Sequence, residues 1–215
     1  MLVILVAAIG VAGGWLGGAI GRKLQAEQSV DEYDKAVLAN IEAAAKIQSV
    51  TGAYALACDK LEWPNEIYVD LRKVKTVDSA LKAIANHPQV GQLVLEGTDL
   101  TDAGMKYVAA FPRLQRLGVY GTQVSDAGVK DLEELTHLES LELGRTKVTD
   151  AGLKHLGKLH KLEFLSLSET AITDEGLKSL KGLSHLEELD ISSTKATDAG
   201  VADLQKALPK CSITH

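Results

Sequence analysis

Cysteine and aromatic residues are scarce in this chain of 215 residues. The two cysteines, Cys58 and Cys211, stand far apart in the sequence, and neither belongs to a C-x-x-C pair or to a zinc-type Cys/His spacing. Aromatic residues make up only 4% of the chain, which leaves little surface on which nucleic-acid bases could stack. We therefore expect no disulfide framework, no metal site and no stacking platform for nucleic acid.

An excess of positive charge is also missing. The formal net charge is −6, which argues against nucleic acid as the main partner, because such proteins neutralise phosphates with lysine and arginine. The sequence contains no H-E-x-x-H motif, no evident Ser/His/Asp set and no glycine loop that could cradle a phosphate. We therefore expect no catalytic activity and no cofactor.

Charge is absent altogether from residues 2–20. At about 1.5 Å per residue, a helix of this length reaches close to the 30 Å thickness of a bilayer's hydrocarbon core. No basic residue precedes Arg22, and no convincing cleavage site follows, although a cleavable signal peptide would need both. The sequence therefore predicts a retained single-pass membrane anchor or uncleaved signal within residues 1–23, with cleavage as the alternative.

The flanks of this anchor bear on its orientation and pairing. Arg22 and Lys23 follow the apolar segment directly, which favours a cytoplasmic location for the rest of the chain. Gly10, Gly14 and Gly18 are spaced four residues apart, a pattern that lets two helices approach closely in lipid. The glycines thus allow a homodimer through the anchor, while the alternative is an anchor that is simply rich in glycine.

The dominant feature of the sequence is a repeat of 24 residues. Three residue types recur at this spacing and define the repeat frame. The aspartate column is Asp102, Asp126, Asp150, Asp174 and Asp198; the threonine column is Thr98, Thr122, Thr146, Thr170 and Thr194; the glycine column is Gly104, Gly128, Gly152, Gly176 and Gly200. A fixed period of this length indicates a solenoid, in which each coil is too small to fold alone and packs on its neighbours.

The repeat at residues 138–161 shows how one coil is expected to fold. Leu141 and Leu143 have the alternating spacing of a short strand, and Leu153, Leu156 and Leu159 follow on one face of a helix. Between them, the threonine column is expected to turn inward as a structural ladder whose hydroxyls bond the backbone of adjacent coils. The residue before each column aspartate, such as Thr149, has the chemistry of a helix N-cap.

The aspartate column has two interpretations. Carboxylates in register could bind metal, but each also stands in the first helical turn, where the helix dipole favours an anion by about 0.3–1 kcal/mol. We therefore predict a capping role and no metal. Glycine in the same first turn lowers helix propensity, so its presence predicts a close approach between neighbouring coils.

The pattern L-x-x-L-x-L-x-x-T-x-V-T-D-A-G-L-x-x-L resembles the leucine-rich repeat family, in a bacterial-type 24-residue form, over residues 66–213. Threonine stands at the ladder position, where the family usually has asparagine or cysteine. The resemblance implies an α/β fold: a right-handed, ribonuclease-inhibitor-like solenoid in a horseshoe arc, with a parallel sheet on the concave side and helices on the convex side. It also implies a protein-binding scaffold.

The repeat frame divides the chain into an anchor, a cap and a solenoid. After the anchor (1–23), residues 24–65 form a juxtamembrane helix and an N-terminal cap, with a strand expected at 49–57; a coiled-coil stalk is the alternative for the helix. Residues 66–89 form a degenerate first repeat. The regular repeats are 90–113, 114–137, 138–161, 162–185 and 186–210, and a closing strand follows at 211–213.

The concave face of the sheet is the predicted site of partner binding. Residue types typical of interface hot spots and charged anchors occupy its exposed strand positions. They are Tyr68, Arg72, Arg116, Tyr120, Glu142, Arg145, Phe164, Glu188 and Asp190. The partner is expected to be a protein, and the alternative is a surface without a partner. The recognition subunit of an enzyme assembly and a self-associating structural envelope protein are the other functions that stay open.

Overall fold

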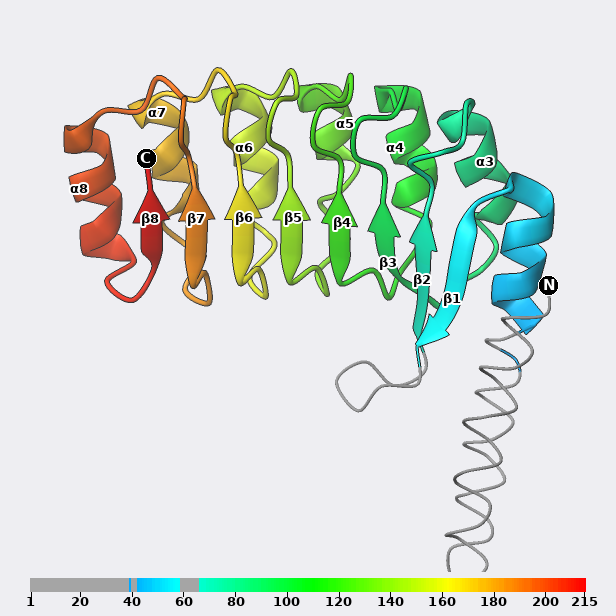
Figure 1. Cartoon of the computed structure of the whole chain (residues 1–215). Helices are drawn as coiled ribbons and strands as arrows, with labels where there is room; N and C mark the ends of the chain where they lie inside the picture. Colours follow the sequence, from blue (N-terminus) through cyan, green and yellow to red (C-terminus); the bar gives the residue numbers. More distant parts are fainter. Residues whose placement is uncertain (1–38, 40–41, 59–65) are drawn as a thin grey trace, which may run out of the picture.

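The computed structural model describes residues 39, 42–58 and 66–215. The strands of this part of the chain form one eight-stranded sheet, in which spatial order follows chain order (Figure 1). The strands are β1 (Tyr54–Cys58), β2 (Glu66–Asp70), β3 (Val90–Val94), β4 (Arg116–Gly118), β5 (Ser140–Glu142), β6 (Phe164–Ser166), β7 (Glu188–Asp190) and β8 (Ser212–Thr214). The helices that follow β2 are α3 (Val77–Ile84), α4 (Asp102–Val108), α5 (Asp126–Lys130), α6 (Asp150–Leu156), α7 (Asp174–Leu177), the 3-10 helix η1 (Lys178–Leu180) and α8 (Asp198–Ala207).

The parallel strands β2 to β8 are stacked in the register that the repeat predicts. Leu117 pairs with Leu141, Leu141 with Leu165, and Leu165 with Leu189. All four side chains are buried, because they form one continuous leucine row beneath the sheet. The predicted alignment of these leucines is confirmed, and with it the α/β solenoid.

The helices that connect the strands lie together on one face of the sheet (Figure 1). We call the other side of the sheet its open face. Each helix from α4 to α8 begins after a threonine or serine whose side-chain oxygen accepts a backbone N–H of the first turn, as Thr149 does from Ala151. The predicted N-caps are therefore present, and they fix where each strand-to-helix loop ends.

The N-terminal cap differs from the prediction in one boundary. Residues 42–51 are helical, so the strand expected at 49–57 begins only at Tyr54. The helix ends because Gly52 adopts a positive φ of 67° and its N–H bonds the carbonyl of Gln48. From there β1 runs antiparallel to β2, with Ala53 and Ala55 buried and Tyr54 exposed. The hairpin itself is confirmed.

At the other end of the sheet, β8 pairs with β7 and follows the last helix. Cys211 is 4% exposed at this end, and burial raises the pKa of its thiol. The cysteine thus packs as the small apolar group that the sequence predicted.

The predicted anchor at residues 2–20 and its glycines lie outside the described residues, as does most of the predicted juxtamembrane helix. Within residues 39, 42–58 and 66–215, no helix has both the length and the apolar character needed to cross a bilayer.

Candidate binding face

The open face carries rows of side chains that run across the strands. One row contains the first residues of β4 to β7, which are Arg116, Ser140, Phe164 and Glu188, each paired in register with the next. We call the side of the sheet formed by the N-terminal ends of the parallel strands the start edge. The side formed by their C-terminal ends is called the end edge. The two edges differ in how their charges are satisfied.

Charged residues near the end edge pair with one another. Arg72 donates to Asp70 through Nε at 3.0 Å and through a second nitrogen at 2.7 Å, and it lies 3.7 Å from Glu96. These hydrogen bonds raise the pKa of Arg72 and lower the pKa of Asp70. Tyr68, on the same strand as Asp70, stacks edge-to-face on Tyr54 with ring centroids 6.4 Å apart. The predicted site residues Tyr68 and Arg72 are therefore engaged within the chain.

Tyr120 also makes its main polar contact inside the chain. Its hydroxyl donates to Glu169 at 2.6 Å, which bridges two coils and raises the pKa of the tyrosine. The ring reaches this partner because Gly144 leaves room: a Cβ at Gly144 would lie 2.7 Å from it. Arg145 lies close enough for its charge to act on the same hydroxyl.

Two further predicted residues, Glu142 and Asp190, lie on the third strand position. Burial raises the pKa of Glu142, and the negative charge of Glu96 adds to the effect. Burial also opposes ionisation of Asp190, but hydrogen bonds from Ser192 at 2.6 and 3.0 Å outweigh it and lower the pKa. Asp190 is thus satisfied by its own turn.

The start edge has a different character, because it contains a shallow depression of about 390 Å³ across β4 to β7. Three of its lining residues, Arg116, Phe164 and Glu188, belong to the predicted site. The others are Glu139, Ser140, Glu163 and Glu187. The structure therefore brings together one arginine, one aromatic ring and four glutamates on the open face.

Sequence reasoning missed Glu139, Glu163 and Glu187 as site residues. Each stands directly before a strand, and the three are 24 residues apart. Their N–H groups join neighbouring coils: Glu163 bonds the carbonyl of Glu139, and Glu187 bonds that of Glu163, both at 2.8 Å. The glutamate column was visible in the repeat frame, but only exposed strand positions were considered there.

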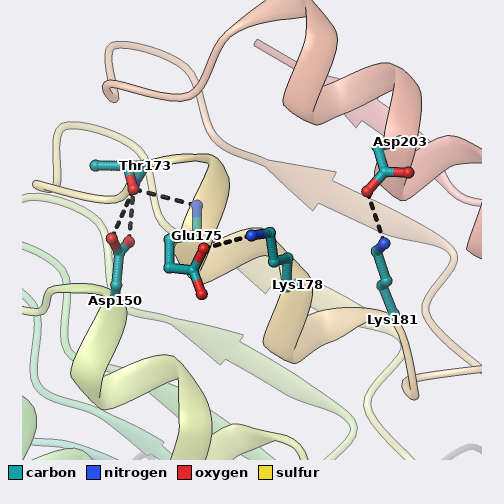
Figure 2. Close-up of polar contacts among 6 residues, drawn as sticks. All are labelled: Asp150, Thr173, Glu175, Lys178, Lys181 and Asp203. Carbon is teal, nitrogen blue, oxygen red and sulfur yellow. Dashed lines mark hydrogen bonds and ion pairs between the residues drawn. The ribbon is translucent and has the colours of Figure 1, made fainter.

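The aspartate column joins one coil to the next. Asp78 and every column aspartate except Asp198 accept both the backbone N–H and the hydroxyl of the N-cap residue in the following coil, at 2.6–3.2 Å. We call this arrangement the aspartate clip; its pairs are Asp78–Thr101, Asp102–Ser125, Asp126–Thr149, Asp150–Thr173 and Asp174–Thr197. Figure 2 shows Thr173 between Asp150 and the N–H of Glu175, donating to one and accepting from the other.

The glycine column makes room for the clip. A Cβ at Gly152 would lie 2.5 Å from Oδ1 of Asp126, and Gly104, Gly128, Gly176 and Gly200 face the preceding aspartate in the same way. The last member, Asp198, has no following coil: its side chain is 99% exposed and contacts only His215, at 3.1 Å, within the described residues. The clip is therefore a contact between coils: the N-cap side chains are the preceding threonine or serine, and the capping role that the sequence predicted for the aspartates stays a prediction.

The threonine ladder works inside each coil. Thr98, Thr122, Thr146, Thr170 and Thr194 each donate to the carbonyl three residues earlier, at 2.5–2.8 Å. The expectation that these hydroxyls bond adjacent coils is therefore wrong. A hydroxyl on a short side chain closes the local turn, whereas the longer reach of aspartate spans the gap between coils.

Ion pairs on the helix side add to the contacts between coils. Lys181 contacts Asp203 at 2.6 Å, and Glu133 accepts from His155 and Lys158 (Figure 2 shows the first of these). In the part of the chain that the structure describes, no group of three or more His, Cys, Asp or Glu residues is placed to hold a metal ion.

Comparison with known proteins agrees with this geometry. Residues 134–157, 158–181 and 182–204 each match the family model for the leucine-rich repeat. These three repeats are leucine-rich repeats. No curated protein matches the chain in sequence.

Two solved structures are similar to this chain. An internalin (inlF) from Listeria monocytogenes is 23% identical with a TM-score of 0.56, and the match covers 66% of this chain and 38% of the internalin. A leucine-rich-repeat protein from Leptospira interrogans is 24% identical with a TM-score of 0.46, over 61% of this chain and 38% of that protein. This chain thus spans well under two thirds of either protein, and the likeness concerns the fold.

Proposed function

We propose that this chain is a membrane-tethered module that binds a partner protein on the open face of its leucine-rich-repeat sheet. The observation that carries the proposal is the depression on that face, where Phe164 stands among charged side chains on a scaffold fixed by clips. An aromatic ring surrounded by polar groups is the usual anatomy of an interface hot spot. Proteins with this fold commonly serve as interaction scaffolds, which supports the same function.

Phe164→Ala tests this proposal. The full-length chain, extracted in mild detergent from cells that express it, is used to capture partners, and the captured proteins are compared between variants. We expect Phe164→Ala to lose partners that the wild type retains, because truncating a hot-spot ring costs about 2 kcal/mol or more.

Tyr54→Ala is the control, since it removes an exposed ring at the far end of the sheet that packs on Tyr68 and lies outside the depression. If Phe164→Ala and Tyr54→Ala capture the same partners as the wild type while both remain folded, the open face is not the binding site.

The tether is a separate part of the proposal. It is supported by the 19 uncharged residues at positions 2–20 and by Arg22 and Lys23, which favour a cytoplasmic solenoid. We expect the full chain to resist alkaline carbonate extraction and a chain without residues 2–20 to be extracted. In sealed inside-out vesicles, added protease should digest the repeats; protection of the repeats would reverse the orientation.

A further inference from the structure

Carboxylates at the start edge lack the partners that their counterparts at the end edge have. Arg72 pairs with Asp70 at 2.7 Å. By contrast, none of the four glutamates in the depression forms an ion pair or a side-chain hydrogen bond within the described residues. With Arg116, the lining carries a formal charge of −3, because four carboxylates stand against one guanidinium. An uncompensated field of one sign attracts a ligand of the other sign.

Two buried polar groups next to the depression lack hydrogen-bond partners among the described residues. They are Oε2 of Glu66, which lacks a donor, and Nε2 of Gln92, which lacks an acceptor; these side chains are 7% and 9% exposed. Gln92 is the register neighbour of Arg116, in the row that forms the depression floor. Glu66 lies over Gly91 at the start edge, where the negative charge of Glu139 and the positive charges of Arg113 and Arg116 act on it.

These two buried groups without hydrogen-bond partners indicate which chemical groups a ligand should carry. A buried polar atom without a partner is unfavourable, so a ligand group that comes within hydrogen-bond distance of it is favoured. Oε2 of Glu66 can accept a hydrogen bond from an N–H donor, and Nε2 of Gln92 can donate one to a carbonyl oxygen. A polypeptide with basic side chains supplies both, through its main chain and its guanidinium or ammonium groups.

We propose that the start edge of the open face recognises a basic segment of a partner protein, with arginine or lysine side chains against Glu139, Glu163, Glu187 and Glu188. An apolar residue of the segment packs on Phe164. The depression crosses four strands, or about 14 Å at a spacing of about 4.8 Å, which matches about four extended residues. This inference rests on the proposed function and names the chemistry of the partner.

The test uses two fluorescein-labelled peptides, RRLRR and EELEE, and the full-length chain in neutral detergent micelles. Fluorescence anisotropy measures the dissociation constant at low and at high salt. We expect the wild type to bind RRLRR, to lose affinity as salt rises, and not to bind EELEE. The double substitution Glu163→Gln/Glu187→Gln should weaken RRLRR binding about fivefold, because each surface ion pair contributes up to about 1 kcal/mol.

Glu42→Gln/Glu134→Gln is the matched control. It changes the net charge equally at two exposed residues outside the depression, and its affinity should stay within about twofold of the wild type. The four substituted glutamates, Glu42, Glu134, Glu163 and Glu187, are all exposed, so both double variants should fold. Circular dichroism verifies this.

Three results would overturn the inference: equal losses in both double variants, binding of EELEE as tight as that of RRLRR, or wild-type affinity in Glu163→Gln/Glu187→Gln. If partner capture depends on Phe164 while one of these results holds, the open face still binds a protein and only its basic chemistry is wrong. Capture that does not depend on Phe164 overturns the proposed function itself.

Discussion

At the scale of single residues, the column aspartates decide how one coil holds the next. Asp126 accepts the N–H and the hydroxyl of Thr149, both at 2.7 Å. Hydrogen bonds to a charged group contribute about 1.5–3 kcal/mol, and removing the acceptor leaves the donors of the N-cap without a partner. We therefore expect Asp126→Ala to lower the free energy of unfolding by about 2 kcal/mol, measured by urea denaturation of the full chain.

The column contains its own control for this prediction. Asp198 has the same place in its helix but no following coil, so Asp198→Ala should change the free energy of unfolding by less than about 0.5 kcal/mol. Equal effects of Asp126→Ala and Asp198→Ala would mean that the local helix dipole, and not the inter-coil clip, explains the column.

The glycine column makes a second prediction at this scale. In the wild type, Gly152→Ala should be destabilising by about 1–2 kcal/mol, because its Cβ would displace the carboxylate of Asp126, which it approaches to 2.5 Å. In the Asp126→Ala background, the same substitution should be neutral or favourable by up to about 1 kcal/mol, the helix propensity of alanine over glycine. A double-mutant cycle measures this coupling; purely additive effects would contradict the clip.

The sequence predicted these columns but not their partners. A period of 24 residues places Asp126 relative to Asp150 with certainty. It does not say whether a side chain reaches within its own coil or to the next, because both partners recur with the same period. The bonds between coils therefore come from the aspartates, and not from the ladder threonines as we had expected.

At the scale of elements, the helices are too short to be stable alone. The helix α7 has only four residues before it continues as η1, whereas isolated helices shorter than about 12 residues are marginal in water. Their stability must come from packing on the neighbouring coils and from the clips at their first turns. Protonation of a clip carboxylate is therefore expected to weaken the contact between two coils.

The acid sensitivity can be predicted from Asp174. Hydrogen bonds from the backbone and the side chain of Thr197 lower the pKa of this carboxyl below its ordinary 3.8. Its contribution to stability is therefore complete above that value and is lost as the pH falls through the lowered pKa. We expect the urea midpoint of the wild type to fall more steeply below about pH 4 than that of Asp174→Asn; parallel pH profiles would contradict this assignment.

One element boundary was wrong for a physical reason. Tyr54 and Leu56 alternate as in a strand, and the alternation extends back through Gly52 to Val50. Apolar residues spaced four apart also suit a helix, so the pattern alone does not locate the boundary. The positive φ of Gly52 does, because glycine adopts it without strain and ends the helix there.

At the scale of the whole molecule, each coil packs mainly on its two neighbours, although the Tyr120–Glu169 hydrogen bond reaches one coil further, so stability should vary along the solenoid. The helix α8 is held by the clip from Asp174 on one side only. We expect Asp174→Ala to raise amide hydrogen exchange in α8 while α4 and α5 keep their protection. Mass spectrometry after deuterium labelling measures this change; faster exchange along the entire chain would indicate a single cooperative unit.

The sequence anticipated the open face in part. It identified Arg116, Phe164 and Glu188, which the register of the strands brings into one depression. It could not show that Arg72 and Tyr120 are held by partners inside the chain, because those contacts join side chains whose directions depend on turn geometry. The contrast between paired charges at the end edge and the unpaired carboxylates of Glu139, Glu163, Glu187 and Glu188 at the start edge, within the described residues, therefore emerges only from the structure.

Site-specific photo-crosslinking tests the proposed role of the open face most directly. A photoreactive amino acid is placed at Ser140, in the depression, or at Lys154, an exposed residue on the helix of the same coil. On irradiation in living cells, we predict a discrete protein adduct from position 140 and none from position 154. An adduct that forms equally from both positions, or only from position 154, would contradict a partner bound on the open face.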